Sequence, residues 1–285
     1  MMIQMTGHSS QENKKLIRAP FFGAFFLISL LCLSLSSCHQ NKKTLKIAFI
    51  DTGFCPDLIE TKKNITIHKT KEFAGHNGLY CESFKKSNRR FHGHLVLDNF
   101  LKHLKVKDQI SVFPLVVFDN SGKQSAFAWR NALHFIKENN MDLMISASGL
   151  KINKEDSNSL VLPEDLTVLV ASGQRSIDID DKDRLFPQSD PSKELLLIGS
   201  YFPPIQNGDH HNLFKKTLLY QSKIDYYFPD SIGKRNLAGS SYAVSVAAAK
   251  ALNLCLIELN DLKNCLSKHK KPISFANSPI QAFTY

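Results

Sequence analysis

Three side chains that together could activate a nucleophile stand at the ends of apolar or helical patterns in the sequence. Asp51 directly follows the apolar run 45–50 (LKIAFI), His92 opens a helical pattern, and Ser241 lies among small residues before an alanine-rich stretch. A carboxylate can orient an imidazole, and an imidazole can take the proton of a hydroxyl. The three residue types are therefore the parts of a nucleophilic catalyst, provided that the fold brings them together.

Each of these residues also has a simpler interpretation. Residues 51–53 (DTG) match the signature of aspartic proteases, but those enzymes need two such loops and this chain has one. His92 and His94 have the spacing of a metal pair, but no third ligand follows at helical or hairpin spacing. Gly-Ser-Ser at 239–241 before a helix is by itself usually an N-cap. The joint order and spacing of the three residues favour the catalytic interpretation.

The elements that must position these residues alternate between short apolar runs and helical patterns, which indicates βαβ units. We expect strands at 45–50, 110–118, 143–147, 166–171 and 195–200, and helices at 93–104, 126–139 and 240–259. Continuous apolar strands suit a parallel sheet that helices cover on both faces. The predicted fold class is α/β, and the candidate residues fall at element ends, where such folds place their sites.

Composition limits the classes of protein to which the chain can belong. Among the 285 residues, the low counts of 13 glycines and 11 prolines exclude a collagen-like chain. A charged fraction of 22% together with 20 phenylalanines excludes a wholly disordered one. The net charge is +10, and the basic residues occur in short pieces without the interleaved aromatic side chains that single-stranded nucleic acid needs. We interpret them as solvated surface and expect no nucleic-acid partner.

The N-terminus has the layout of a signal peptide. Residues 1–18 are polar with three basic side chains, and residues 19–35 (APFFGAFFLISLLCLSL) carry no charge. The following Leu-Ser-Ser-Cys, at 35–38, resembles the lipobox of bacterial lipoproteins, which implies that Cys38 is lipidated and becomes the first mature residue. The alternative is an uncleaved membrane anchor.

We therefore expect a signal peptide at 1–37, a short lipidated tether at 38–43 and one domain at 44–285. Removing residues 1–37 takes away three basic side chains and one acidic one and leaves a net charge of +8. The expected location is outside the cytoplasm, on a membrane that Cys38 anchors: the outer membrane, the periplasmic face or the cell surface.

Four cysteines remain besides Cys38 and the Cys32 of the signal peptide. An exported location permits disulfides, and the most local of the three pairings joins Cys55 with Cys81 and Cys255 with Cys265. The spacing leaves all three pairings open, and no CxxC pair suggests zinc.

The segments around the three candidate residues resemble the motifs of subtilisin-like serine proteases (subtilases). Residues 47–54 (IAFIDTGF) are similar to the aspartate motif, 92–98 (HGHLVLD) to the histidine motif and 239–245 (GSSYAVS) to the serine motif, in the order of that family. Residues 128–148 are also similar to a family helix and strand, so the resemblance covers nearly all of 45–258.

Two of these motifs depart from the family. Leu97 and Asp98 replace small residues after the histidine, and we expect them to crowd the packing of the helix that His92 opens. Ser245 replaces the proline of the serine motif.

The resemblance implies a subtilisin-like fold of three layers and an endopeptidase mechanism. Ser241 would attack the peptide carbonyl, His92 would transfer the proton and Asp51 would orient the imidazole. The backbone N–H of Ser241 and the amide of Gln174 would bind the oxyanion, although the family has asparagine at the position of Gln174.

The substrate would pair as a strand along Ala147, Ser148 and Gly149. The resemblance implies no cofactor and no metal, and residues 178–183 (DIDDKD) suggest calcium by composition only. The expected partners are a peptide or protein substrate and the membrane, and the protein is expected to be a monomer. The alternative function is a catalytically weak or inactive subtilase-fold lipoprotein that binds a peptide or a protein partner, which the changes at Gln174, at Ser245 and around His92 favour.

Overall fold

The structure is a computed structural model of the chain. It describes residues 44–75, 81, 91–119, 121–153, 156, 158–173, 184–201, 224–229, 239–275 and 278–283. The chain divides into two units, Met1–Lys42 and Lys43–Tyr285, and every described residue belongs to the second. The signal peptide and tether with Cys38, the oxyanion candidate Gln174 and the acidic segment 178–183 are predictions that lie outside the described residues.

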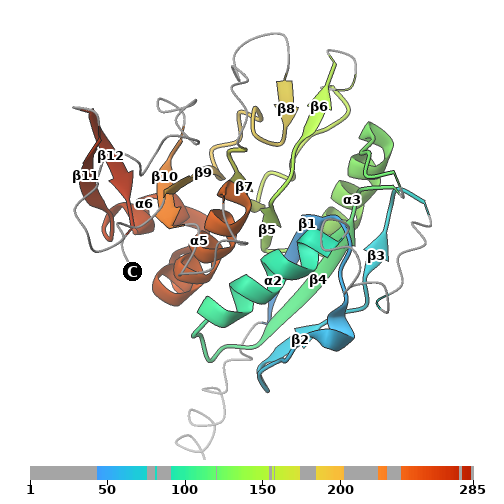
Figure 1. Cartoon of the computed structure of the whole chain (residues 1–285), viewed down its shortest axis with the longest axis horizontal. Helices are drawn as coiled ribbons and strands as arrows, with labels where there is room; N and C mark the ends of the chain where they lie inside the picture. Colours follow the sequence, from blue (N-terminus) through green and yellow to red (C-terminus); the bar gives the residue numbers. More distant parts are fainter. Residues whose placement is uncertain are drawn as a thin grey trace, which may run out of the picture. The chain divides into compact units, whose positions relative to one another are not determined.

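A mostly parallel sheet of ten strands forms the centre of the described unit (Figure 1). From one edge to the other its strands are β11 (Lys271–Phe275), β12 (Ser278–Ala282), β10 (Tyr226–Pro229), β9 (Leu195–Tyr201), β7 (Thr167–Ala171), β5 (Leu143–Ser146), β1 (Leu45–Asp51), β4 (Ile110–Val116) and β2 (Ile65–Ile67). The short β3 (Lys71–Glu72) also pairs with β4. Of the described pairings in this sheet, that of β11 with β12 is antiparallel. A separate antiparallel pair joins β6 (Leu150–Ile152) and β8 (Arg184–Phe186).

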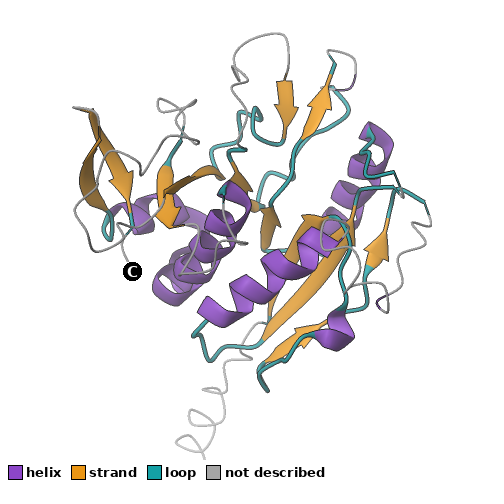
Figure 2. Cartoon of the chain, in the orientation of Figure 1, coloured by secondary structure: helices purple, strands orange, loops and turns teal. Residues whose placement is uncertain are grey.

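The longer helices pack against the sheet in two groups (Figure 2). The helices α2 (His92–His103) and α5 (Ser240–Cys255) share one hydrophobic core with Ile47 and Phe49 of β1. The helix α3 (Ala126–Glu138) shares a second core with Ala48 and Ile50. Successive strand residues point to opposite faces of a sheet, so the two groups lie on opposite faces. The predicted α/β class is confirmed.

One predicted element is wrong in its extent. The long helix expected at 240–259 ends as α5 at Cys255, and Glu258 has non-helical backbone angles (φ −101°, ψ 30°) within the short 3₁₀ segment η6 (Leu256–Asp261). The chain turns there because α6 (Leu262–Ser267) folds back and buries its apolar side chains in the core that α5 also fills. The other predicted strands and helices are present, with ends that differ by at most two residues.

The crowding expected from Leu97 and Asp98 does not disturb α2. Leu97 is fully buried in the core that α2 and α5 share, where α5 contributes many alanines. Asp98 instead forms an ion pair with Lys102 one turn further along the helix. The helix accommodates both residues, because Leu97 joins the core that α2 and α5 share and the half-buried Asp98 pairs with a lysine on its own helix.

The structure pairs the four cysteines in the most local way. Cys55 is bonded to Cys81, with their Cα atoms 5.6 Å apart, and Cys255 is bonded to Cys265, with their Cα atoms 6.0 Å apart. The first bond joins the loop after β1 to the segment before α2, and the second joins the end of α5 to α6.

The stretch Ser240–Ser267, which contains α5, η6 and α6, is long and apolar enough to cross a membrane by length and composition alone. However, 67% of its most apolar window is buried inside the protein. Among the described residues, this stretch therefore has the character of a core helix.

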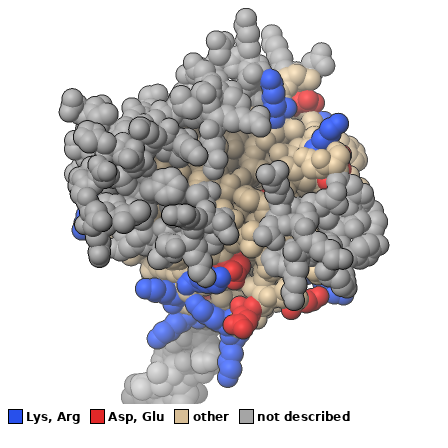
Figure 3. Space-filling view, in the orientation of Figure 1, with Lys and Arg blue, Asp and Glu red and all other residues tan. Residues whose placement is uncertain are grey.

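Charged side chains of both signs share the described surface. In Figure 3, Lys and Arg side chains lie beside Asp and Glu side chains, mostly toward the lower edge of the face shown. Some of them form ion pairs, such as Lys268 with Glu258 and Lys263 with Asp225.

We expect Phe100→Ala to destabilise the protein by about 3–5 kcal/mol. Phe100 of α2 is fully buried, and its ring lies 5.2 Å from the ring of Phe49 in β1, so removing it leaves a cavity between helix and sheet. Phe127→Ala is the matched control, because Phe127 is 63% exposed and its loss should change stability by less than about 0.5 kcal/mol. Urea unfolding of both variants measures the difference, and equal midpoints would contradict this description of the core.

Candidate active site

Asp51 ends β1, in the middle of the sheet between β4 and β5. Only 1% of the residue is exposed, so its carboxylate is shielded from water and needs hydrogen-bond donors within the protein. The backbone N–H of Thr52 donates to Oδ1 at 2.7 Å, and His92 supplies the second donor. The strand thus presents a buried acceptor at its carboxyl end.

His92 is the first residue of α2 and pairs directly with that carboxylate. Its Nδ1 lies 2.9 Å from both Oδ1 and Oδ2 of Asp51. A carboxylate only accepts hydrogen bonds, so Nδ1 carries the proton and Nε2 of the neutral ring is left as a base.

The charge of Asp51 shifts the titration of His92. The negative charge and the hydrogen bond of Asp51 raise the pKa of the His92 imidazole, while burial acts in the opposite direction. The pairing therefore stabilises the folded protein most below about pH 6.5, the ordinary pKa of histidine. This contribution is lost as the pH rises through the raised pKa.

The loop after β1 also caps the helix that carries His92. The N–H of Gly93 donates to Oγ1 of Thr52 at 3.1 Å, and the N–H of His94 donates to the carbonyl of Gly53 at 3.0 Å. These bonds satisfy N–H groups that the first turn of a helix leaves unpaired, since Phe91 at the N-cap contributes no side-chain bond. The DTG segment therefore both positions the carboxylate and fixes the start of α2.

Gly93 is required by the close approach of this loop. A Cβ atom at that position would lie 2.7 Å from Cζ of Phe54 and 2.8 Å from Cβ of Asp51, which are distances that real Cβ atoms do not show. A larger residue would push α2 away from β1 and would lengthen the contact between His92 and Asp51.

Ser241 lies in the first turn of α5. The preceding Gly239 has φ of 105°, a conformation that favours glycine and lets the chain turn sharply into the helix. The hydroxyl of Ser241 donates to the carbonyl of Ala147 at 3.1 Å. The neighbouring Ser240 accepts a bond from the N–H of Gly173 at 3.0 Å, so the helix start is tied to the segments that follow both β5 and β7.

The structure brings the starts of α2 and α5 together through Tyr242. The rings of Tyr242 and His92 meet in a T-shaped arrangement, with centroids 5.9 Å apart. Burial and the charge of Asp51 raise the pKa of the Tyr242 phenol to about 12, so this hydroxyl stays neutral. Between the described residues His92 and Ser241 there is no hydrogen bond, because the serine hydroxyl points to Ala147.

The predicted substrate segment lies directly beside Ser241. The carbonyl of Ala147 accepts from Ser241, and the carbonyl of Ser148 accepts from the hydroxyl of Ser146 at 2.9 Å. Two glutamines also bind this segment: Gln124 donates to the carbonyl of Gly149 at 3.1 Å. Gln188, which is 7% exposed, donates to the carbonyls of Ser148 and Ala171 at 3.3 and 3.0 Å.

Sequence reasoning did not identify Gln124, Gln188 or Tyr242. The two glutamines reach the segment from positions about 25 and 40 residues away, and no short motif links them to it. A Cβ at Gly149 would lie 2.4 Å from Oε1 of Gln188, so this glycine allows the glutamine to pack against the segment. Tyr242 lies inside the serine motif, but its contact with His92 depends on how α2 and α5 pack.

The alternative metal interpretation of His92 and His94 does not fit the structure. Residues two apart on a helix point in different directions, and Nδ1 of His92 is paired with Asp51. Among the described residues, Cys255, Cys265 and His269 also have ligand atoms within 4.8 Å of one another. The two sulfurs are joined in a disulfide, so they offer no thiolate ligand.

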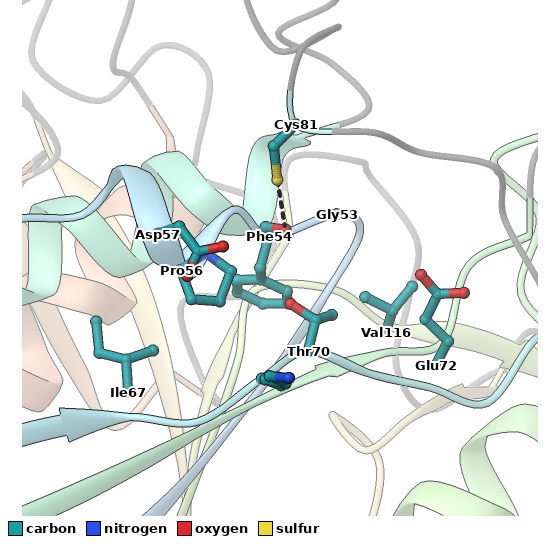
Figure 4. Close-up of a pocket in the computed structure, with 10 residues that line it drawn as sticks. Gly53, Phe54, Pro56, Asp57, Ile67, Thr70, Glu72, Cys81 and Val116 are labelled. Carbon is teal, nitrogen blue, oxygen red and sulfur yellow. Dashed lines mark hydrogen bonds between the residues drawn. The ribbon is translucent and has the colours of Figure 1, made fainter.

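A cavity of about 280 Å³ lies beside the loop that follows Asp51 (Figure 4). Its walls include Phe54, Asp57, Thr70 and Glu72, and Oγ1 of Thr70 is buried without a partner among the described residues. Neither His92 nor Ser241 lines it. The cavity therefore lies beside the candidate site and does not contain its reacting side chains.

No protein-family model matches the chain, and no curated protein matches it either. The chemistry of the site is therefore inferred from its own residues.

We expect Asp51→Asn to lower the pKa of His92. The wild-type imidazole should titrate above about 6.5, because the Asp51 charge favours its protonated form. In the variant, burial becomes the dominant influence and should move the pKa below that value. The titration of the His92 ring protons, followed by NMR, measures both values.

Asp98→Asn is the matched control, because it removes a carboxylate from the same helix without touching the pair. An unchanged His92 pKa in Asp51→Asn would contradict the assigned pairing.

Proposed function

We propose that the protein is an exported, lipid-anchored serine endopeptidase that hydrolyses peptide bonds with Asp51, His92 and Ser241. One observation carries this proposal. A buried carboxylate holds Nδ1 of His92 at 2.9 Å, at the start of a helix that packs against the helix whose first turn presents Ser241. The carboxylate fixes the tautomer of the ring, which is what a general base beside a serine needs.

Each residue has one chemical role in this proposal. After its hydroxyl turns from Ala147 toward Nε2 of His92, Ser241 attacks the carbonyl carbon of the peptide and its proton passes to the imidazole. His92 then gives that proton to the leaving amine, and water repeats the sequence to release the acyl group. Asp51 accepts the hydrogen bond from Nδ1 and stabilises the imidazolium, in line with the raised pKa of His92.

The start of α5 supports oxyanion binding. The N–H of Ser241 lies in the first turn of the helix, where N–H groups have no intrahelical acceptor and the helix dipole favours negative charge. Gly173 is held against Ser240, and Gln174 is the next residue in the chain. We propose that the Gln174 amide supplies the second donor.

The finer fold is part of the same proposal. A mostly parallel sheet with α2 and α5 on one face and α3 on the other is compatible with the three-layer fold of subtilases. The motifs around the three residues support the subtilase assignment.

A second candidate function is a peptide-binding lipoprotein without catalysis. The observation that favours it is the hydrogen bond of the Ser241 hydroxyl to Ala147, because a hydroxyl held there is not activated by His92. The carbonyls of Ser148 and Gly149 are also engaged by glutamine side chains. Labelling of the serine separates the two functions.

We expect a fluorophosphonate probe to label the full chain at Ser241, because the probe reacts with serines that a base activates. Ser241→Ala and His92→Ala should abolish labelling, and Asp51→Asn should slow it by roughly 10⁴-fold, as expected when the orienting carboxylate of a triad is lost. Mass spectrometry of the labelled peptide identifies the modified residue.

Ser240→Ala is the matched control, since it removes the adjacent hydroxyl and should leave the label on Ser241. A folded wild-type protein that takes no label would reject the endopeptidase and favour the binding protein.

Cys38→Ser should release the protein from membranes. The proposed lipid chains on Cys38 would hold the domain through buried methylene groups, and both disulfides are compatible with an exported location. Fractionation of cells that produce each form measures the distribution, and Cys32→Ser in the signal peptide is the matched control. A Cys38→Ser protein that stays with the membranes would contradict lipid anchoring.

A further inference from the structure

We propose that Asn99 and Ser245 are positioning residues that hold the helix of His92 against the helix of Ser241. The inference rests on the proposed function, because it assigns a role in the reaction to residues that do not touch the substrate. Nδ2 of Asn99 donates to Oγ of Ser245 at 2.7 Å, across 146 residues of sequence. Oγ of Ser245 in turn donates to the carbonyl of Tyr242 at 2.7 Å.

Helix periodicity places this bond on the faces that carry the candidate catalytic residues. Asn99 follows His92 by seven residues, which is almost two full turns, so both side chains lie on the same face of α2. Ser245 follows Ser241 by four residues and lies one turn further along the same face of α5. The bond therefore joins the two helices directly behind the reacting groups.

The contacts form a closed circuit between the helices. Asn99 of α2 holds Ser245 of α5, Ser245 holds the backbone of Tyr242, and the Tyr242 ring meets the ring of His92 back on α2. A circuit of this kind fixes both the separation of the helices and their offset along the axis. Ser241 lies next to Tyr242 in the chain, so the same contacts also fix its position relative to His92.

Ser245 is suited to this role because one hydroxyl both donates and accepts. The residue is fully buried, so its hydroxyl can bond only within the protein. Most other side chains along this part of α5 are apolar, and their packing contacts impose no specific geometry. In the motif that the chain resembles, this position holds a proline, which could not accept the Asn99 bond.

A displacement of about 1 Å between nucleophile and base costs on the order of 10²-fold in rate. We expect Asn99→Ala and Ser245→Ala each to slow fluorophosphonate labelling of Ser241 in the full chain by about 10- to 100-fold per folded molecule. The double variant should be no slower than the slower single variant, because either change breaks the same bond.

The pH profile separates positioning from general damage. The midpoint of labelling against pH should stay at the wild-type value in all three variants, because the pair of His92 with Asp51 is untouched. Lys102→Ala is the matched control, since this exposed side chain lies on α2 outside the circuit and its loss should leave the rate unchanged. Wild-type rates per folded molecule in the single variants, or losses that multiply in the double variant, would overturn the proposal.

A second readout does not depend on catalysis. The nuclear Overhauser effect between the ring protons of His92 and Tyr242 should be present in the wild type and weakened in both single variants. If the wild type takes no label, the endopeptidase proposal fails, while this measurement still decides whether the pair sets the helix placement. An unchanged effect in both variants would show that Asn99 and Ser245 only add stability.

Discussion

The burial of the Asp51 carboxylate is the constraint on which the site depends. A charge that is 1% exposed at the end of a central strand is costly unless donors surround it. The N–H of Thr52 and Nδ1 of His92 meet this need at 2.7 and 2.9 Å. The imidazole can reach the carboxylate because the first turn of α2 packs against the loop that follows β1. This close packing is possible only because residue 93 has no side chain. The need to pair one buried carboxylate thus determines where β1 ends, where α2 begins and why residue 93 is glycine.

The same loop shows how function and folding share residues. Thr52 and Gly53 cap the first turn of α2 with a hydroxyl and a carbonyl, so the segment that orients the histidine also stabilises its helix. A change in this loop would therefore alter the pKa of His92 and the stability of α2 together. The start of α5 has similar ties, because Ser240 holds Gly173 while Ser241 holds the Ala147 carbonyl.

The features that could be predicted from the sequence are those with local signals. Buried parallel strands appear as continuous apolar runs, and Asp51, His92 and Ser241 stand at element ends that such runs define. The predicted end of the helix at residue 259 was wrong. The chain turns after Cys255 because of core packing and a disulfide that both involve α6, and neither has a local signal in the sequence. The bonds of Gln188 and the bond between Asn99 and Ser245 join residues that are far apart in sequence, so no periodicity or short motif indicates them.

What distinguishes a catalyst from a binding protein at this site is the direction of one hydroxyl. The pair of Asp51 and His92 is already assembled, and its tautomer leaves Nε2 as a base. The hydroxyl of Ser241 rests on the carbonyl of Ala147, a neutral hydrogen bond of the kind that contributes about 0.5–1.5 kcal/mol. A peptide that pairs along the segment after β5 would compete for that carbonyl, so substrate binding itself would free the hydroxyl to turn toward His92. In the proposed mechanism, breaking this bond would slow the reaction by less than a factor of about 15, which is small beside the acceleration that an oriented base would provide.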